Sequence, residues 1–251
     1  MKIKTAFRYQ AEDNKKAVLV YYLVVLVTFF GMYVLSLLVG NEGTMSGNNA
    51  FEMITAIFLF ICGLCAFKES FGMAIQNGVS RKSLFVSRLA VMGAISGGLA
   101  VIDVLLSFVF GFLARFNDRF FYEAMFTLLY DRRIQEIGTV QKVFEMLLFN
   151  IALYLAASAV GYFITILYYR LNTAGKIAVS IGVPALFIIG PSVDFSLTGG
   201  TITQRVLDLI AYAMGGPNEN VYITIGVAVA ICALFSLCAW LLMRRAVVKD
   251  S

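Results

Sequence analysis

The sequence predicts an all-α integral membrane protein with six transmembrane helices and both termini in the cytoplasm. Sixty per cent of its 251 residues are apolar and only 14% are charged, whereas soluble domains contain about 45–50% apolar and about 25% charged residues. Six apolar stretches approach the roughly 20 residues that a helix needs to cross a hydrocarbon core of about 30 Å. These stretches take up about half of the chain, so we expect one transmembrane domain over residues 1–251 and no separate soluble domain.

The six predicted spans differ in how clearly the sequence marks them. The second needs Glu52 near its outer end to reach spanning length, and the fifth is short and contains Pro184. The first follows a basic stretch, as a signal peptide would, but its length and the lack of a small-x-small cleavage site favour a retained span. The spans are predicted at residues 17–39, 50–67, 89–114, 146–169, 177–193 and 221–243.

The distribution of basic residues predicts the orientation. Fourteen of the 20 Lys and Arg residues precede the first span, follow the last, or lie in the loops after the second and fourth spans. Because cytoplasmic loops carry the excess of Lys and Arg, these segments are expected in the cytoplasm. Residues 2–16 are expected to form an N-terminal elbow helix on anionic headgroups.

Two external loops, residues 115–145 and 194–220, are long enough to hold short helices before the sixth span. In the first loop, an apolar stripe begins at Phe121 and continues through Met125. In the second, apolar residues recur with helical spacing from Val206, with Thr203 as the expected N-cap and Gly215-Gly216-Pro217 as the stop. We expect both helices to cap the bundle at the outer interface, with a substrate gate as the alternative.

The charged insert at residues 68–88 has the pattern of two helices joined by a turn. Phe71 and Ile75 share one face of the first helix, Asn77-Gly78 tolerates a left-handed turn, and Ser80 is placed to cap the second helix. A force applied to a short helix held between two spans would move both spans. The alternative is a basic loop that only sets the topology.

The same insert resembles a known family. Glu69-x-Phe71 followed by Gln76-Asn-Gly-Val-Ser-Arg-Lys82 is similar to the cytoplasmic region between the second and third spans of ABC-2-type permeases, particularly small peptide-exporter permeases of the phenol-soluble modulin type. The predicted topology agrees with that family. The likeness covers nearly the whole chain as topology but only about fifteen residues as a motif.

The resemblance implies that the segment from Phe71 to Lys82 is a coupling helix that docks on a separate ATPase subunit. It also implies a bacterial plasma-membrane exporter with two permease copies, two ATPase subunits, and an amphipathic or hydrophobic substrate such as a toxin or antimicrobial peptide. The coupling residues that we single out are Glu69, Phe71, Ile75, Gln76, Asn77, Gly78, Ser80, Arg81 and Lys82.

Nothing in the sequence indicates catalysis by this chain. Histidine is absent, which excludes His-based triads and most catalytic zinc sites. Gly175-Lys176 lacks the preceding glycine of a phosphate-binding loop and is followed by Ile177. Cys62 and Cys65 have redox spacing without the βαβ context that gives it meaning. We therefore expect no cofactor or metal here, with ATP and Mg²⁺ bound by the partner ATPase.

Polar residues inside the spans suggest a translocation path. Asp103 lies near the middle of the third span, where an ionised carboxylate costs about 2.5–3.5 kcal/mol on insertion scales. It is either a polar contact for a substrate or ion, or a hydrogen-bonded packing residue, and Asn150 is its candidate partner. The rival function is a self-contained channel or ion-coupled carrier that uses Asp103. Small residues predict close helix packing, within the chain or across a dimer, at Gly93, Gly97 and Gly161.

Overall fold

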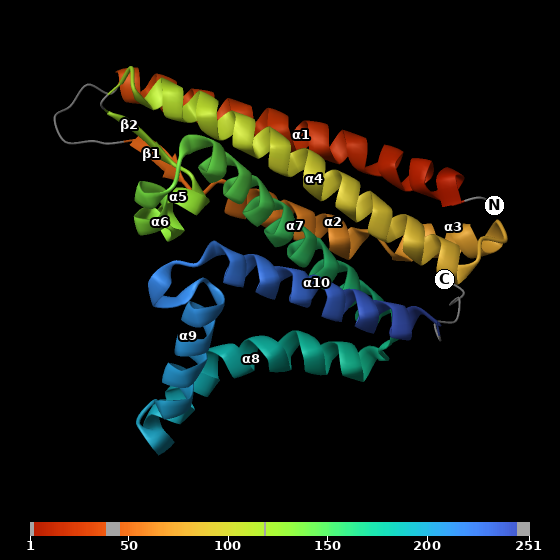
Figure 1. Ribbon diagram of the computed structural model, residues 1–251. Helices are drawn as coiled ribbons and strands as arrows, with labels where there is room; N and C mark the ends of the chain where they lie inside the picture. Colours follow the sequence, from red (N-terminus) through yellow and green to blue (C-terminus); the bar gives the residue numbers. More distant parts are fainter. Residues whose placement is uncertain (1–2, 39–45, 118, 245–251) are drawn as a thin grey trace.

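The computed structural model describes residues 3–38, 46–117 and 119–244 (Figure 1). Within these residues, six helical segments are long and apolar enough to cross a membrane, which confirms the multi-span architecture that the composition predicts. The six segments are α1 (Ile3–Leu38), α2 (Glu52–Cys65) with α3 (Lys68–Gln76), α4 (Arg81–Ala114), α7 (Thr139–Arg170), α8 (Thr173–Thr198) and α10 (Val221–Arg244).

The helices run between two distinct ends of the molecule. The start of α1, the end of α10 and helix α3 lie at one end, which we call the terminal end (Figure 1). The opposite, strand end carries the short elements β1 (Ser46–Asn49), β2 (Phe120–Glu123), α5 (Met125–Leu129) and α6 (Asp131–Glu136). Helix α9 (Thr201–Ala213) and the 3₁₀ turn η1 (Gly216–Asn218) connect α8 to α10.

Helix α1 is continuous from Ile3 to Leu38. The expectation of a separate N-terminal elbow is therefore wrong for residues 3–16, while residue 2 lies outside the described residues. The physical reason is that the helix contains no proline and no glycine before Gly31, so nothing in its first half breaks the hydrogen-bond ladder. At 1.5 Å per residue, α1 is about 54 Å long. It therefore exceeds the hydrocarbon thickness of about 30 Å and extends beyond it.

The closest helix contact lies between α2 and α7 and depends on two glycines. A Cβ at Gly161 would overlap the Phe60 carbonyl oxygen, and a Cβ at Gly63 would lie 2.5 Å from the Ser158 carbonyl oxygen. The predicted packing role of Gly161 is confirmed. A Cβ at Gly93 or Gly97 would meet nothing within 4 Å, so the expected close contact at these two glycines is not made with any described part of the chain.

A parallel pairing of two short strands joins segments that are far apart in the sequence. Ser46 pairs with Phe120 and Asn49 with Glu123, and the Ala50 amide donates to the Glu123 carbonyl at 2.9 Å. The expected helical stripe from Phe121 is thus wrong at its start, because Phe121 lies in β2 and the helix begins only at Met125. Four residues carry too little periodicity to show such a pairing in the sequence.

Helices α8 and α9 stand apart from the inner bundle. Asp194 is the one buried residue of α8, and α8 packs mainly against α9. Helix α9 begins at Thr201, so Thr203 is not its N-cap. Instead, the Asp194 carboxylate accepts from the Thr203 amide at 2.7 Å across a turn in which Gly199 and Gly200 have φ of +68° and +86°. The predicted stop at Gly215-Gly216-Pro217 is confirmed.

Candidate functional site

The first candidate site is the elbow, which we define as α3, residues 77–80 and the first turn of α4. Helix α3 ends at Gln76, and the Asn77 side-chain amide donates to the Met73 carbonyl at 2.8 Å. Gly78 follows with φ of +69°, a conformation that favours glycine. The chain therefore turns where Asn77-Gly78 predicts that it should.

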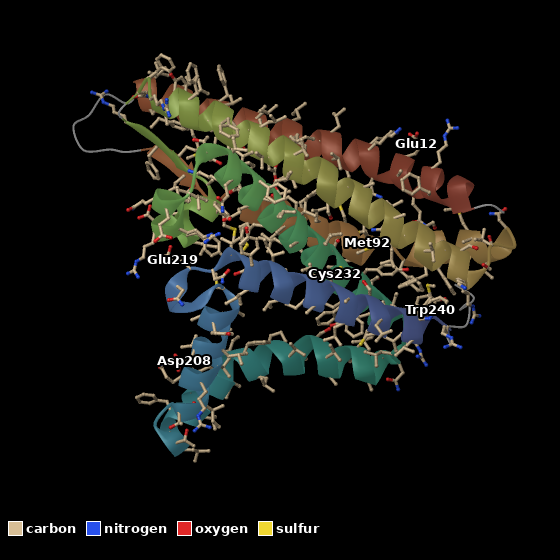
Figure 2. All side chains as sticks on the ribbon, in the orientation of Figure 1. Glu12, Met92, Asp208, Glu219, Cys232 and Trp240 are labelled. Carbon is tan, nitrogen blue, oxygen red and sulfur yellow. The ribbon has the colours of Figure 1, made fainter. Side chains whose placement is uncertain are left out.

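The start of α4 is fixed by two polar contacts. The Ser80 hydroxyl oxygen accepts from the Ser83 amide at 3.1 Å, so Ser80 is the N-cap that the sequence predicts. The Arg81 guanidinium donates to the Arg244 carbonyl at 2.6 Å, near the end of α10. Trp240 of α10 (labelled in Figure 2) lies 5.1 Å from the Phe85 ring of α4, between ring centroids. The elbow is thus tied to α10 as well as to α4.

Phe71 anchors the elbow to the inner bundle. Its side chain is only 1% exposed, stacks on Phe67 at 4.8 Å and meets the Tyr169 ring of α7 at 5.9 Å. Val79 is buried in the same apolar cluster. A partner protein therefore has no access to the Phe71 side chain, and the expectation that the whole segment from Phe71 to Lys82 docks has to be narrowed to its exposed part.

Apart from Met73 of α3, the exposed part of the elbow is polar and basic. Ile75 and Arg81 are half-buried, and the side chain of Glu69 lies outside the described residues although its backbone belongs to α3. We call the solvent-exposed residues of the elbow from position 76 onward the apex, and they are Gln76, Asn77, Gly78, Ser80 and Lys82. The apex sits on a rigid base because the residues before and after it are packed or hydrogen-bonded.

The second candidate site is a polar cluster buried among α1, α2, α4 and α7. Asp103 is fully buried, accepts from the Tyr22 hydroxyl at 2.7 Å and accepts a second, very short hydrogen bond from the Tyr154 hydroxyl. On the preceding residue of α1, the Tyr21 hydroxyl lies 2.7 Å from the hydroxyl of Thr55 in α2. The cluster joins the side chains of four helices in the interior of the bundle.

Asn150 lies one helical turn before Tyr154 on α7 and is also fully buried. Both polar atoms of its side-chain amide lack a hydrogen-bond partner among the described residues, as does one carboxylate oxygen of the buried Glu52. Asn150 is therefore not hydrogen-bonded to Asp103, although the two share the same interior. Buried polar atoms without partners are costly, which makes this region a candidate for a bound ion or water.

The sequence does not reveal which residues complete this cluster. The tyrosines read as part of an aromatic membrane belt, and only the packing of α1 and α7 against α4 brings their hydroxyl groups to the carboxylate of Asp103. A buried tyrosine hydroxyl normally finds a partner. That rule marks Tyr22 and Tyr154 as polar residues in apolar spans, but it does not say what they bind.

A third polar network closes the strand end. The Arg133 guanidinium donates to both carboxylate oxygens of the fully buried Glu145, at 2.8 and 2.7 Å. Gln141 and Tyr222 donate to the same carboxylate at 2.9 and 3.0 Å. These hydrogen bonds raise the pKa of the Arg133 guanidinium further above its usual range. Glu219, labelled in Figure 2, accepts from the Arg132 amide at 3.0 Å. The network joins α6 to α7 and to the start of α10.

Comparison of the chain with protein-family models, with characterised proteins and with solved structures finds no match. The function is therefore inferred from the residues of the elbow and of the buried cluster.

Proposed function

We propose that this chain is the transmembrane permease subunit of an ATP-driven exporter in a bacterial plasma membrane. Two copies of the chain would associate with two separate ATPase subunits, which bind ATP and Mg²⁺. The substrate class is amphipathic or hydrophobic, and toxin or antimicrobial peptides fit it. The observation that carries the proposal is the elbow, whose exposed apex stands on a base packed into α4, α7 and α10. The resemblance of residues 69–82 to ABC-2-type permeases supports the same assignment.

The contacts of the elbow explain how a push on the apex reaches the spans. Phe71 lies against Tyr169 of α7, and Arg81 holds the Arg244 carbonyl of α10. Ser80 is continuous with α4 through its capping bond. Because packed interiors deform little, movement of an ATPase against the apex shifts these three helices together rather than bending the elbow alone. Such a shift alternately opens a path to each side of the membrane.

Co-purification with a functional readout tests the proposal. The tagged chain is purified from membranes of its native host, and the eluate is assayed for a co-purifying ATPase whose activity rises with substrate. We expect Lys82→Glu to reduce the stimulated activity at least about tenfold, because Lys82 is exposed on the apex. Lys176→Glu is the matched control, since it reverses an exposed charge at the start of α8. Normal coupling in the Lys82→Glu variant would contradict the proposal.

Phe71→Ala is a poor substitute for that test. Truncating a buried phenylalanine costs about 3–5 kcal/mol of stability. Because Phe71 is only 1% exposed, loss of coupling in this variant would report unfolding of the elbow rather than loss of a docking contact. Exposed apex residues separate the two effects.

An ion-coupled carrier is the second candidate function. It is favoured by the full burial of Asp103 and by the unpartnered amide of Asn150. This function predicts transport in liposomes that contain the chain alone, and loss of that transport in Asp103→Asn. Transport that requires added ATPase and ATP would exclude it.

A further inference from the structure

A groove at the strand end is separate from both the elbow and the buried cluster. It has a volume of about 780 Å³ and lies between the last turns of α4, strand β2 and the first turns of α7. Phe108, Phe112 and Arg115 line it from the α4 side, Tyr122 and Glu123 from β2, and Lys142 from α7. This volume falls in the range of about 300–1,000 Å³ that is typical of small-molecule sites.

The wall of the groove that α4 contributes is apolar, and its aromatic side chains are exposed on the outer surface of that helix. Phe108 and Phe112 of α4 are 51% and 59% exposed. Since α4 crosses the membrane, side chains exposed on its span face hydrocarbon rather than water. Val109 also lines a second cavity of about 510 Å³ between α1 and α4, whose other lining residues are apolar or aromatic. An acyl chain can therefore reach the groove sideways from the bilayer.

The groove also carries two cations, one from the α4 side and one from the α7 side. Arg115 directly follows the end of α4, and Lys142 lies in the first turn of α7. Neither side chain makes a hydrogen bond or an ion pair with another residue in the described part of the chain. Glu123 is the acidic residue among those that line the groove, and its carboxylate has no such partner either. The lining residues thus carry a net charge of one positive unit.

Tyr122 also lines the groove, but its hydroxyl does not face it. Its hydroxyl oxygen is buried and has no hydrogen-bond partner among the described residues. Burial and the nearby Glu52 carboxylate raise the pKa of this hydroxyl, so it keeps its proton. The groove therefore combines an apolar wall and two unpaired cations at the end of a membrane-spanning helix.

We propose that this groove binds an anionic phospholipid, with the phosphate between Arg115 and Lys142 and an acyl chain along Phe108 and Phe112. Guanidinium and ammonium groups are the usual partners of phosphate, and basic pockets between transmembrane helices bind lipid headgroups. Among molecules with an acyl chain, a phospholipid of the surrounding leaflet is the one always present. A cationic peptide fits less well because the unpaired charges of the groove would repel it.

Native mass spectrometry of the full-length chain in neutral detergent tests the proposal with phosphatidylglycerol as the probe. We expect Arg115→Gln/Lys142→Gln to weaken retention of phosphatidylglycerol at least about tenfold, which corresponds to about 1.4 kcal/mol. Arg119→Gln/Arg205→Gln is the matched control, because it removes the same charge from exposed residues that do not line the groove. Equal retention by both double variants would overturn the proposal.

A second variant tests the shape of the groove and leaves its charges intact. Gly111 lines the groove, and a Cβ placed there meets nothing within 4 Å. A Cβ is therefore accommodated at this position, and Gly111→Phe places a ring in the space meant for the acyl chain. We expect it to lower phosphatidylglycerol retention about tenfold; unchanged retention contradicts the proposed position of the lipid.

Three further probes identify what the groove selects. Phosphatidylcholine should be retained at least about tenfold less than phosphatidylglycerol, and inorganic phosphate at 10 mM should displace neither lipid. Equal retention of the two lipids, or displacement by phosphate alone, would overturn the proposal. An amphipathic peptide that displaces phosphatidylglycerol one for one would assign the groove to a peptide instead. None of these measurements involves an ATPase, so the outcome is independent of the proposed transport function.

Discussion

Replacing Gly63 with alanine should loosen the packing of α2 against α7, even though alanine favours helix. The added Cβ would lie 2.5 Å from the Ser158 carbonyl oxygen and 2.9 Å from the Tyr162 amide nitrogen, whereas ordinary contacts begin near 3.4 Å. The two backbones would therefore have to separate by about 0.9 Å. Both obstacles are main-chain atoms of a helix, so no side chain can move aside to relieve the overlap.

The expected magnitude follows from two opposing effects. Overpacking of a close contact costs about 1–3 kcal/mol, and the higher helix propensity of alanine offsets about 1 kcal/mol of it. Gly97→Ala is the matched control because a Cβ there meets nothing within 4 Å. Gly97→Ala should therefore gain only the benefit of alanine's higher helix propensity, about 0.5–1 kcal/mol in the free energy of unfolding. The two substitutions are chemically identical but should shift stability in opposite directions.

The four cysteines of the chain provide the assay. They are not paired in disulfides; Cys65 is exposed, whereas Cys62, Cys232 and Cys238 are half-buried. A thiol-reactive fluorophore therefore labels Cys65 in the folded protein and the other three more fully as the protein unfolds. Heating the purified variants in detergent with this probe gives the midpoint of unfolding. We expect Gly63→Ala below the wild type and Gly97→Ala at or above it. A Gly63→Ala midpoint equal to that of Gly97→Ala would refute the close contact between α2 and α7.

Three further predictions concern the polar contacts. Tyr154→Phe should lower the free energy of unfolding by about 1 kcal/mol, because it removes one of the hydrogen bonds to Asp103; the same thiol assay measures it, and no change would show that the bond is not formed. Glu145→Gln should lower the free energy of unfolding by about 2–3 kcal/mol because it leaves the Arg133 guanidinium without its anion. Limited proteolysis at the strand end should then be faster than in the wild type. Asp194→Ala should remove the cap of α9 and lower the free energy of unfolding by about 0.5–2 kcal/mol. Amide hydrogen exchange should become faster in α9 and remain unchanged in α7. An equal increase in both helices would contradict a local role of Asp194.

The local features of the elbow could be predicted because they depend on neighbouring residues. Asn77-Gly78 and Ser80 indicate a turn and a cap, and the backbone conformation at Gly78 and the bond from Ser83 agree with both. For Phe71, the neighbouring residues are not enough to predict its contacts. Its place on an apolar face is visible in the sequence, but whether that face meets a partner protein or the bundle depends on where Tyr169 lies.

The close helix contact was predicted on one of its two sides. Gly161 stands in a run of small residues and so signals tight packing, whereas Gly63 lies between larger apolar residues and gives no such signal. Gly93 and Gly97 have the small-residue pattern without the contact. Spacing along one helix shows that a close approach is possible, but it does not say which helix approaches.

The amino-acid sequence alone is enough to predict six helices long and apolar enough to cross a membrane, and to predict where the elbow turns. These properties follow from apolar length and from hydrogen bonds between near neighbours, which any placement of the helices would preserve. Three further features become visible once the helices are packed: Tyr22 and Tyr154 donate to Asp103, β1 pairs with β2, and Arg115 and Lys142 share one groove. Each of these joins segments tens of residues apart, and the packing of the helices alone sets those distances.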